Sequence, residues 1–229
     1  MEHHRILVFY LFLIFSVSAG EKDLQESLSD AIFSNDADRV KAALKNGADI
    51  NTLWDNETHL NIAIRQGSGR AVRALVEAGA DVNKANSRGE TAAIYAVSYS
   101  SLEVLSFLVD HKADLKTRDN HGRTLLIVAA RGTVPDFTEY LLRRGADINA
   151  VDKDGMTALM VAALTCNDAI VKALLKSKAN RNVRTKNGET ALDFARHCTW
   201  YNPDIAKDGS QKRTIELLSQ PLAKPAGKK

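Results

Sequence analysis

Apolar residues recur along most of the chain in pairs of short runs, each with helical spacing. Leu159, Ala162 and Ala163 fall on one side of a helix, and a second apolar run follows over residues 170–175. Polar stretches rich in Gly, Asp and Asn separate one pair of runs from the next. The pattern predicts helix pairs, an inner and an outer helix, joined by turns and polar loops.

This arrangement repeats with a period of 33 residues over about 150 residues. A threonine, an alanine and a glycine each recur at the same position of the 33-residue repeat. The series are Thr58, Thr91, Thr124, Thr157 and Thr190; Ala63, Ala96, Ala129, Ala162 and Ala195; and Gly89, Gly122, Gly155 and Gly188, with Asn56 in the glycine place of the earlier copy. A fourth series, Gly47, Gly79, Lys112, Gly145 and Lys178, keeps steps of 32 and then 33.

Each residue type suits its place in the repeat. A threonine hydroxyl can accept a hydrogen bond from an exposed N–H in the first turn of a helix. Gly145 and its equivalents can end the second helix in a left-handed conformation. Alanine at a fixed level lets neighbouring helices approach closely. One such unit cannot bury its apolar face alone, so the copies must stack.

These motifs resemble those of the ankyrin-repeat family. Gly-Glu-Thr-Ala at 89, Gly-Met-Thr-Ala-Leu at 155 and Leu-Leu-Arg-Arg-Gly-Ala-Asp-Ile-Asn at 141–149 carry the resemblance, which covers roughly residues 24–218. It implies an all-α ankyrin-repeat solenoid of about six helix-turn-helix units with short hairpin loops. It also implies binding to a protein partner, whereas the fold alone does not name a function.

The period sets the predicted domain boundaries. An ankyrin-repeat domain spans 20–220, with a signal peptide before it at 1–19 and a disordered basic tail after it at 221–229. Within the domain we expect an N-terminal cap at 22–52, repeats at 53–85, 86–118, 119–151 and 152–184, and a C-terminal cap at 185–220. The last unit carries an insertion of about ten residues between His197 and Gly209.

The third unit departs most from the family pattern. Tyr95, Tyr99 and Lys112 stand where the family has small residues or glycine. We therefore expect this unit to be the least stable internal joint.

The N-terminus reads as an export signal. A charged start with Arg5 precedes an apolar block at 6–15, and small residues lead to a cleavage position after Ala19. The alternative is a short uncleaved anchor. Export predicts a periplasmic or secreted protein in an oxidising compartment, with no membrane span after cleavage.

Charge is uneven along the chain, whose formal net charge is +3. Residues 21–110 hold nine basic and fourteen acidic residues, net −5, and residues 111–229 hold twenty-one and thirteen, net +8. Lys176, Lys178, Arg181, Arg184 and Lys186 form a basic cluster. Because export removes the chain from nucleic acid and stacking aromatics are missing, we expect an acidic protein, an anionic envelope surface or plain solvent opposite this cluster.

The sequence holds no catalytic or metal-binding signature. Gly-x-Ser-x-Gly, His-Glu-x-x-His and the Walker phosphate loop are all missing. We therefore expect a protein that is not an enzyme and has no metal site and no cofactor.

Cys166 and Cys198 are 32 residues apart, one short of a repeat. They should lie at the same level of adjacent units, near the turns that join inner and outer helices. In an oxidising compartment a disulfide between them is as plausible as two free thiols, and a redox-catalytic pair is disfavoured because no Cys-x-x-Cys exists.

The family resemblance implies which positions contact a partner, namely the hairpin tips and the inner-helix ends of the concave side. Trp54, Tyr99, Met156 and Leu164 are apolar where a monomer would have polar residues, as in interface hot spots, although Trp54 and Tyr99 could also pack within the chain. The full candidate set is Trp54, Asp55, Glu57, Arg65, Gln66, Arg88, Glu90, Tyr99, His121, Arg123, Arg131, Lys153, Asp154, Met156, Leu164, Lys186 and Glu189.

The sequence thus predicts an exported module, monomeric alone, that binds another protein through its concave face and hairpin tips. By analogy, it would inhibit or protect against an envelope enzyme such as a peptidoglycan hydrolase, in an immunity-type role. The alternatives are an envelope redox or oxidative-stress accessory protein and a secreted effector that binds host proteins.

Overall fold

The computed structural model describes residues 20, 22–99, 101–133, 135–201 and 209–220. The predicted signal peptide and basic tail lie outside these residues, as does most of the insertion, and all three stay predictions. The chain forms two compact units. The first takes in the described residues up to Tyr99 together with Glu103–Ala113, and the second takes in Ser101, Leu102 and the described residues from Asp114 onward.

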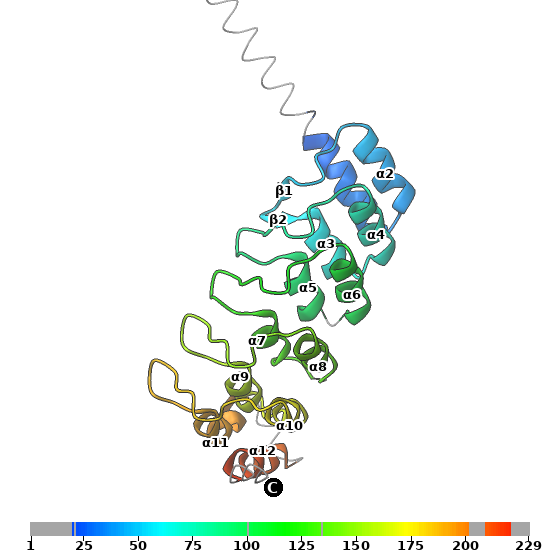
Figure 1. Ribbon diagram of the computed structural model, residues 1–229. Helices are drawn as coiled ribbons and strands as arrows, with labels where there is room; N and C mark the ends of the chain where they lie inside the picture. The colour runs from blue at the N-terminus through cyan, green and yellow to red at the C-terminus, as the bar shows by residue number, and fades with distance from the viewer. Residues whose placement is uncertain (1–19, 21, 100, 134, 202–208, 221–229) are drawn as a thin grey trace, which may run out of the picture. The chain divides into compact units, whose positions relative to one another are not determined.

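The first unit contains three consecutive helix pairs and one short hairpin (Figure 1). The helices are residues 22–33, α2 (Ala37–Lys45), α3 (His59–Arg65), α4 (Gly69–Glu77), α5 (Ala92–Ser98) and α6 (Leu102–Asp110). The hairpin pairs β1 (Leu53–Trp54) antiparallel with β2 (Glu57–Thr58), and Leu53 lies opposite Thr58.

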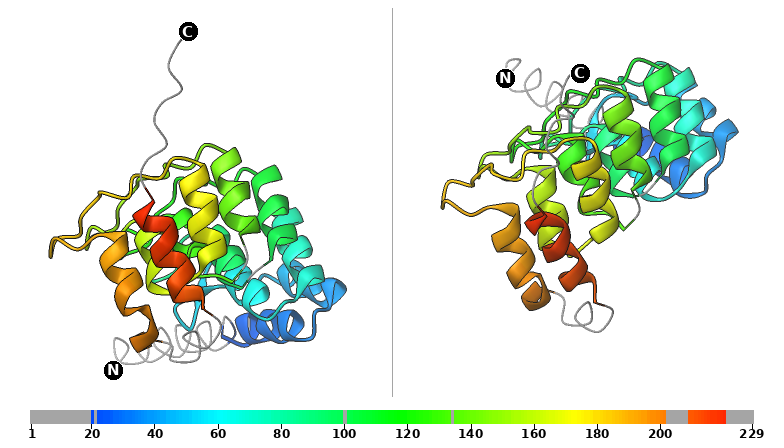
Figure 2. Two further views of the ribbon diagram at one scale, coloured as in Figure 1. Left: turned by 90° about the horizontal axis from the view of Figure 1, so that it is seen from below. Right: turned by 60° about the horizontal axis from the view of Figure 1, so that its bottom comes forward.

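The second unit contains three further helix pairs. They are α7 (Leu125–Ala129) with α8 (Asp136–Arg143), α9 (Ala158–Leu164) with α10 (Asp168–Lys176), and α11 (Ala191–Tyr201) with α12 (Ser210–Ser219). Figure 2 shows α11 and α12, in orange and red, side by side from two further directions.

Stacking of equivalent helices builds the core of each unit. In the first unit α3 packs on α5 and α2 packs on α4. In the second unit α9 packs between α7 and α11, and α10 packs between α8 and α12. The five period alanines from Ala63 to Ala195 are all buried, which allows this close approach. The predicted all-α repeat fold is confirmed.

Threonine begins the inner helices, as the period predicts. The Oγ1 atoms of Thr58, Thr124 and Thr157 accept hydrogen bonds from the amide three residues on, at 3.0, 3.3 and 3.2 Å. Thr91 occupies the same N-cap position of α5, but its side chain makes no capping hydrogen bond. The predicted capping role therefore holds for three of these four threonines.

The last inner helix begins with a different cap. The Asp193 carboxylate accepts hydrogen bonds from the Thr190 amide at 2.9 Å and from the Thr190 hydroxyl at 2.7 Å. Here the threonine is the donor, because an acidic residue stands in the first turn. These two bonds lower the pKa of Asp193, so its carboxylate remains charged at neutral pH.

The predicted left-handed residues end the outer helices. Gly47, Gly79 and Gly145 have φ angles of 106°, 92° and 82°. Lys112 and Lys178, which replace glycine in the same register, adopt φ angles of 69° and 68°. The tertiary stack thus imposes the left-handed turn even where the residue has a Cβ atom that disfavours it.

Backbone hydrogen bonds join neighbouring loop tips within each unit. An amide of one tip donates to a carbonyl of the preceding tip, so the tips are fixed relative to each other without side chains. The pairs are Ser87 N to Asn56 O at 3.2 Å, Lys153 N to His121 O at 2.9 Å and Lys186 N to Asp154 O at 3.1 Å.

Two glycines with the same backbone angle provide a test of this tip-to-tip contact. Gly145 and Gly155 both have φ of 82°, but a Cβ on Gly145 would meet open space, whereas a Cβ on Gly155 would lie 3.1 Å from Lys186 N and Thr185 Cα. We expect Gly145→Ala to lower the free energy of unfolding by about 1 kcal/mol through backbone strain alone. Gly155→Ala should cost about 1–3 kcal/mol more, because the next tip must move. Equal losses in chemical denaturation would contradict the contact.

Candidate functional site

Four of the predicted contact residues converge on one buried tyrosine in the first unit. We call this group the Tyr95 cluster, and its members are Glu57, Arg65, Asn86, Arg88, Glu90 and Tyr95. Its side chains come from the β1–β2 hairpin, the end of α3, the next loop tip and α5. The sequence predicts Glu57, Arg65, Arg88 and Glu90 as separate contacts, and only the structure shows that Asn86 and Tyr95 join them.

The Tyr95 hydroxyl is the centre of the cluster. It donates to Glu57 Oε1 at 2.8 Å and accepts from Arg88 Nη2 at 2.9 Å and from Asn86 Nδ2 at 3.2 Å. Burial raises the pKa of the Tyr95 phenol well above its ordinary range, and the hydrogen bond to Glu57 adds to this effect. The hydroxyl therefore keeps its proton and remains a donor to Glu57.

Two arginines are held in place by two shielded carboxylates. Arg65 Nε and Nη2 lie 3.2 and 3.1 Å from Glu57 Oε2, and Arg88 Nε lies 2.8 Å from Glu90 Oε2. The side chains of Glu57 and Glu90 are each 16% exposed, against 37% for Arg65 and 62% for Arg88. The pKa of Arg88 is raised, mainly by its hydrogen bond to Glu90. The outer surface of the cluster consequently consists of guanidinium groups.

Exposed aromatic side chains accompany the cluster in the same unit. Tyr99 is 49% exposed, and its ring centroid lies 5.6 Å from that of Tyr95. Phe33 is 56% exposed at the end of the first helix. Phe33 lies 32 residues before Arg65, so it occupies the same inner-helix-end position one repeat earlier. This spacing could have identified Phe33 as a candidate contact from the sequence. Trp54 is half-buried in β1.

The other predicted contacts of the first unit, Asp55 and Gln66, are exposed. Asp55 and Asn56 form the turn between β1 and β2 with φ angles of 51° and 64°. Such a turn, with both central residues left-handed, matches the twist of a two-residue hairpin. It presents the Asp55 carboxylate at the tip.

The structure places the predicted contacts of the second unit along its loop tips and inner-helix ends. His121, Arg131, Lys153, Asp154, Lys186 and Glu189 are exposed, and Arg123, Met156 and Leu164 are half-buried. Backbone hydrogen bonds join His121 to Lys153 and Asp154 to Lys186, and the Arg123 side chain bonds within its own tip. Arg123 Nε pairs with Asp119 Oδ2 at 2.5 Å, and the Asp119 side chain is fully buried. This pair stabilises its own tip.

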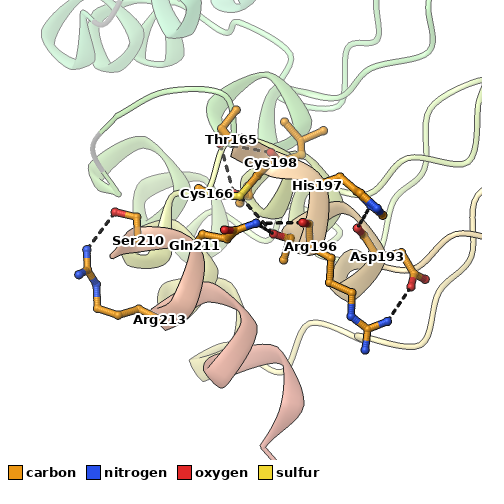
Figure 3. The surroundings of a disulfide bond; sticks show 12 residues. Thr165, Cys166, Asp193, Arg196, His197, Cys198, Ser210, Gln211 and Arg213 are labelled. Carbon is orange, nitrogen blue, oxygen red and sulfur yellow. Dashed lines mark hydrogen bonds and ion pairs between the residues drawn. A yellow bond between two sulfur atoms is a disulfide. The ribbon is translucent and has the colours of Figure 1, made fainter. Parts of the chain in front are cut away.

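A disulfide joins Cys166 and Cys198 in the second unit, with Cα atoms 5.7 Å apart (Figure 3). Cys166 lies in the turn between α9 and α10 with φ of 54°, in the register that Gly67 occupies with φ of 70°. Cys198 lies within α11 rather than in a turn, because α11 has 11 residues whereas α9 has 7. Part of the predicted insertion is therefore an extension of the inner helix. Both cysteines are buried.

Side-chain contacts also hold the terminal helix α12. Gln211 Nε2 donates to the carbonyls of Ala195 and Arg196 in α11, at 3.3 and 2.9 Å, as Figure 3 shows. Arg213 Nε lies 2.6 Å from Asp168 Oδ2 at the start of α10.

Two arginines of the expected basic cluster bond to backbone carbonyls. Arg181 Nη1 donates to the carbonyls of Leu218, at 3.2 Å, and of Gln220, where α12 ends. Arg184 Nη1 donates to the Gly188 carbonyl at 2.6 Å. Both arginines thus satisfy backbone acceptors, and Arg181 does so at a helix C-terminus, where a cation is favourable. Lys176, Lys178 and Lys186 are exposed on the same segment.

His59 is a buried titratable group beneath the hairpin of the first unit. It is the first residue of α3, and its side chain has no exposed area. Burial lowers the pKa of its imidazole from 6.5 to about 4, and the Thr52 backbone and the Asp49 carboxylate only partly oppose this. The ring is therefore neutral at physiological pH.

The described residues contain no group of three His, Cys, Asp or Glu side chains placed to hold a metal ion. Among the same residues, no helix is long and apolar enough to cross a membrane.

Comparison with known protein families agrees with the repeat architecture. The family model for ankyrin repeats, which describes three copies, matches residues 28–119, 71–152 and 125–207. The chain belongs to the ankyrin-repeat family. A search of curated proteins gives no significant match. Ankyrin repeats are a protein–protein interaction module, so the described helix pairs and loop tips form a scaffold that presents side chains to a protein partner.

Acid should weaken the ankyrin fold through His59. The folded-state pKa of about 4 lies below the ordinary 6.5, so the unfolded chain binds the proton first as pH falls. The stabilisation is complete above pH 6.5 and is lost progressively between pH 6.5 and 4, by about 3 kcal/mol in total. His59→Gln should flatten the dependence of unfolding free energy on pH in this window. If urea unfolding at several pH values gives the same pH dependence of the unfolding free energy in His59→Gln as in the parent, the buried neutral imidazole is contradicted.

Reduction should loosen the end of the second unit first. The disulfide closes a loop of 32 residues, which corresponds to about 3–4 kcal/mol in the chain-entropy model. Because repeat proteins can open locally, we expect amide exchange in α11 and α12 to accelerate on adding a reductant, with little change in α7. A Cys166→Ser, Cys198→Ser double variant should exchange rapidly with or without reductant. Uniform acceleration across the unit would contradict a local tether.

Proposed function

We propose that this protein is an exported ankyrin module that binds a protein partner through its hairpin tips and inner-helix ends, with the Tyr95 cluster as the main contact. The observation that carries this proposal is the cluster itself. Two exposed guanidiniums, on Arg65 and Arg88, are fixed by shielded carboxylates beside the exposed ring of Tyr99.

The physical argument concerns side-chain order before binding. Arginine and tyrosine are enriched in interface hot spots, and ordering a long side chain on binding costs about 0.5–1.5 kcal/mol. In the Tyr95 cluster the hydrogen bonds to Glu57 and Glu90 already hold both arginines. A partner therefore meets an arranged surface and loses less entropy when it docks.

Export is the second element of the proposal and rests on the sequence. A charged start, an apolar block at 6–15 and a small residue at 19 favour a cleaved leader. A buried disulfide suits the oxidising compartment to which such a leader directs a chain. Since no ATP is supplied there, a binding module acts by occupancy. Inhibition of an envelope enzyme such as a peptidoglycan hydrolase, as an immunity-type protein, is the specific role we propose.

The disulfide raises the alternative of a redox function. An envelope redox accessory would use Cys166 and Cys198 as responsive thiols, but such thiols are normally accessible to oxidant. Both cysteines here are buried, which supports a structural bond instead. A secreted effector would share the binding surface and differ only in where the protein is found.

Capture from the source cell's envelope tests the proposal. Tagged full-length protein should be recovered from the envelope fraction with Gly20 as its first residue and with one partner in stable complex. Trp54→Ala and Tyr99→Ala should each weaken that complex about 5–30-fold, which corresponds to about 1–2 kcal/mol.

Arg70→Ala provides the control, because Arg70 is exposed on α4, away from the hairpin tips. It should leave the complex unchanged. Recovery from culture supernatant would favour the effector, and an intact leader on cytosolic protein would remove the export proposal. Absence of any partner above background would sink the inhibitor role.

A further inference from the structure

We propose that the Tyr95 cluster recognises a single carboxylate flanked by an apolar side chain on the partner, with Tyr95 as the residue that positions the donors. The inference rests on the proposed function, because it concerns the same surface and adds the chemistry of the recognised group.

Three of the four carboxylate oxygens of the cluster accept hydrogen bonds within it. Glu57 Oε1 accepts from Tyr95, Glu57 Oε2 accepts from Arg65, and Glu90 Oε2 accepts from Arg88 and from Asn86 Nδ2 at 3.1 Å. Both side chains are mostly shielded from solvent. A cationic partner would have to break these bonds to reach an acidic group.

The guanidiniums present the opposite chemistry. Arg65 and Arg88 each use Nε and Nη2 to bond within the cluster. Among the described residues, the Nη1 group of each makes no hydrogen bond. The N–H groups of these partly exposed guanidiniums are charge-assisted donors, and their preferred acceptor is a carboxylate.

An apolar neighbour completes the recognised group. Tyr99 lies at the end of α5 with half of its surface exposed and with its ring near that of Tyr95. A partner side chain that covers this ring removes apolar area from water while the carboxylate meets the arginines. This combination of an aromatic contact with a paired arginine is typical of hot spots.

Charge around the cluster narrows the class of ligand. Residues 21–110 carry a net charge of −5, so a run of acidic residues would be repelled by the surrounding segment. One carboxylate at short range avoids most of that repulsion. We therefore expect a single Asp or Glu next to an apolar residue, rather than a polyacidic tract.

Tyr95 acts through its hydroxyl. The neighbouring members of its register, Ile62, Val128 and Val161, are aliphatic and buried and cannot reach the loop tips with a polar atom. The Tyr95 hydroxyl bonds to Glu57 and Arg88 at once. Tyr95→Phe removes only this oxygen, so it should leave the apolar packing of α5 intact and remove the bond that fixes Arg88 Nη2, while Arg88 Nε stays bonded to Glu90.

The first test uses a random dodecapeptide display library as the probe, with the purified mature chain immobilised. We expect enrichment of peptides with one Asp or Glu within two positions of Leu, Phe, Tyr or Trp. Enrichment of basic or uncharged sequences, or no enrichment, would overturn the carboxylate assignment.

The second test measures affinity for one enriched peptide, labelled with fluorescein, by anisotropy. Arg88→Gln should weaken binding at least tenfold and Tyr95→Phe about three- to tenfold, each measured at a temperature well below the Tm of the variant. Arg70→Gln on α4 is the matched control and should bind as the parent does. Replacing the peptide Asp or Glu by its amide should weaken binding as much as Arg88→Gln, and the two changes together should cost little more than either alone.

Additive losses, or a peptide insensitive to Arg88→Gln, would show that the carboxylate does not contact the cluster and would overturn the inference. Equal affinities of Tyr95→Phe and parent would remove its positioning role. A failed envelope capture with these peptide results intact would instead overturn the location and target of the proposed function and leave the recognition chemistry standing.

Discussion

Close stacking of helix pairs is the constraint on which the rest of the structure depends. A single pair buries too little apolar surface to be stable, so each must lie against its neighbour within the unit. Buried alanines such as Ala96 and Ala162 allow that approach, since a larger side chain at the same level would force the helices apart. Loop tips, caps and turns all follow from this spacing.

The repeating framework makes side-chain variation at its edge useful for binding. Backbone hydrogen bonds between neighbouring tips fix their separation, so a side chain from one repeat can depend on a partner from the next. Glu57 and Arg88 belong to adjacent repeats and meet at Tyr95 for this reason. The binding surface is therefore a property of two repeats together and not of either one.

In α11 and α12, the last described helix pair, further interactions accompany the stacking on α9 and α10. Three kinds of contact stabilise this pair. They are the disulfide, the Gln211 hydrogen bonds to α11 and the Arg181 hydrogen bonds to the end of α12. Arg213 adds an ion pair to α10. Covalent and polar contacts thus add to the helix stacking in this pair.

The sequence by itself determined the repeat, the helix pairs and the left-handed turns, because each follows from residues at a fixed spacing, such as Thr157 and Gly145. It also predicted contact positions at Glu57, Arg65, Arg88 and Glu90. Only the tertiary structure decided that these four share one network, since Tyr95 reaches Glu57 across 38 residues. Likewise, the helical extension that carries Cys198 breaks the period, and no periodic argument could place it. Spacing fixes what recurs, whereas contacts between different repeats depend on how far individual side chains extend in space.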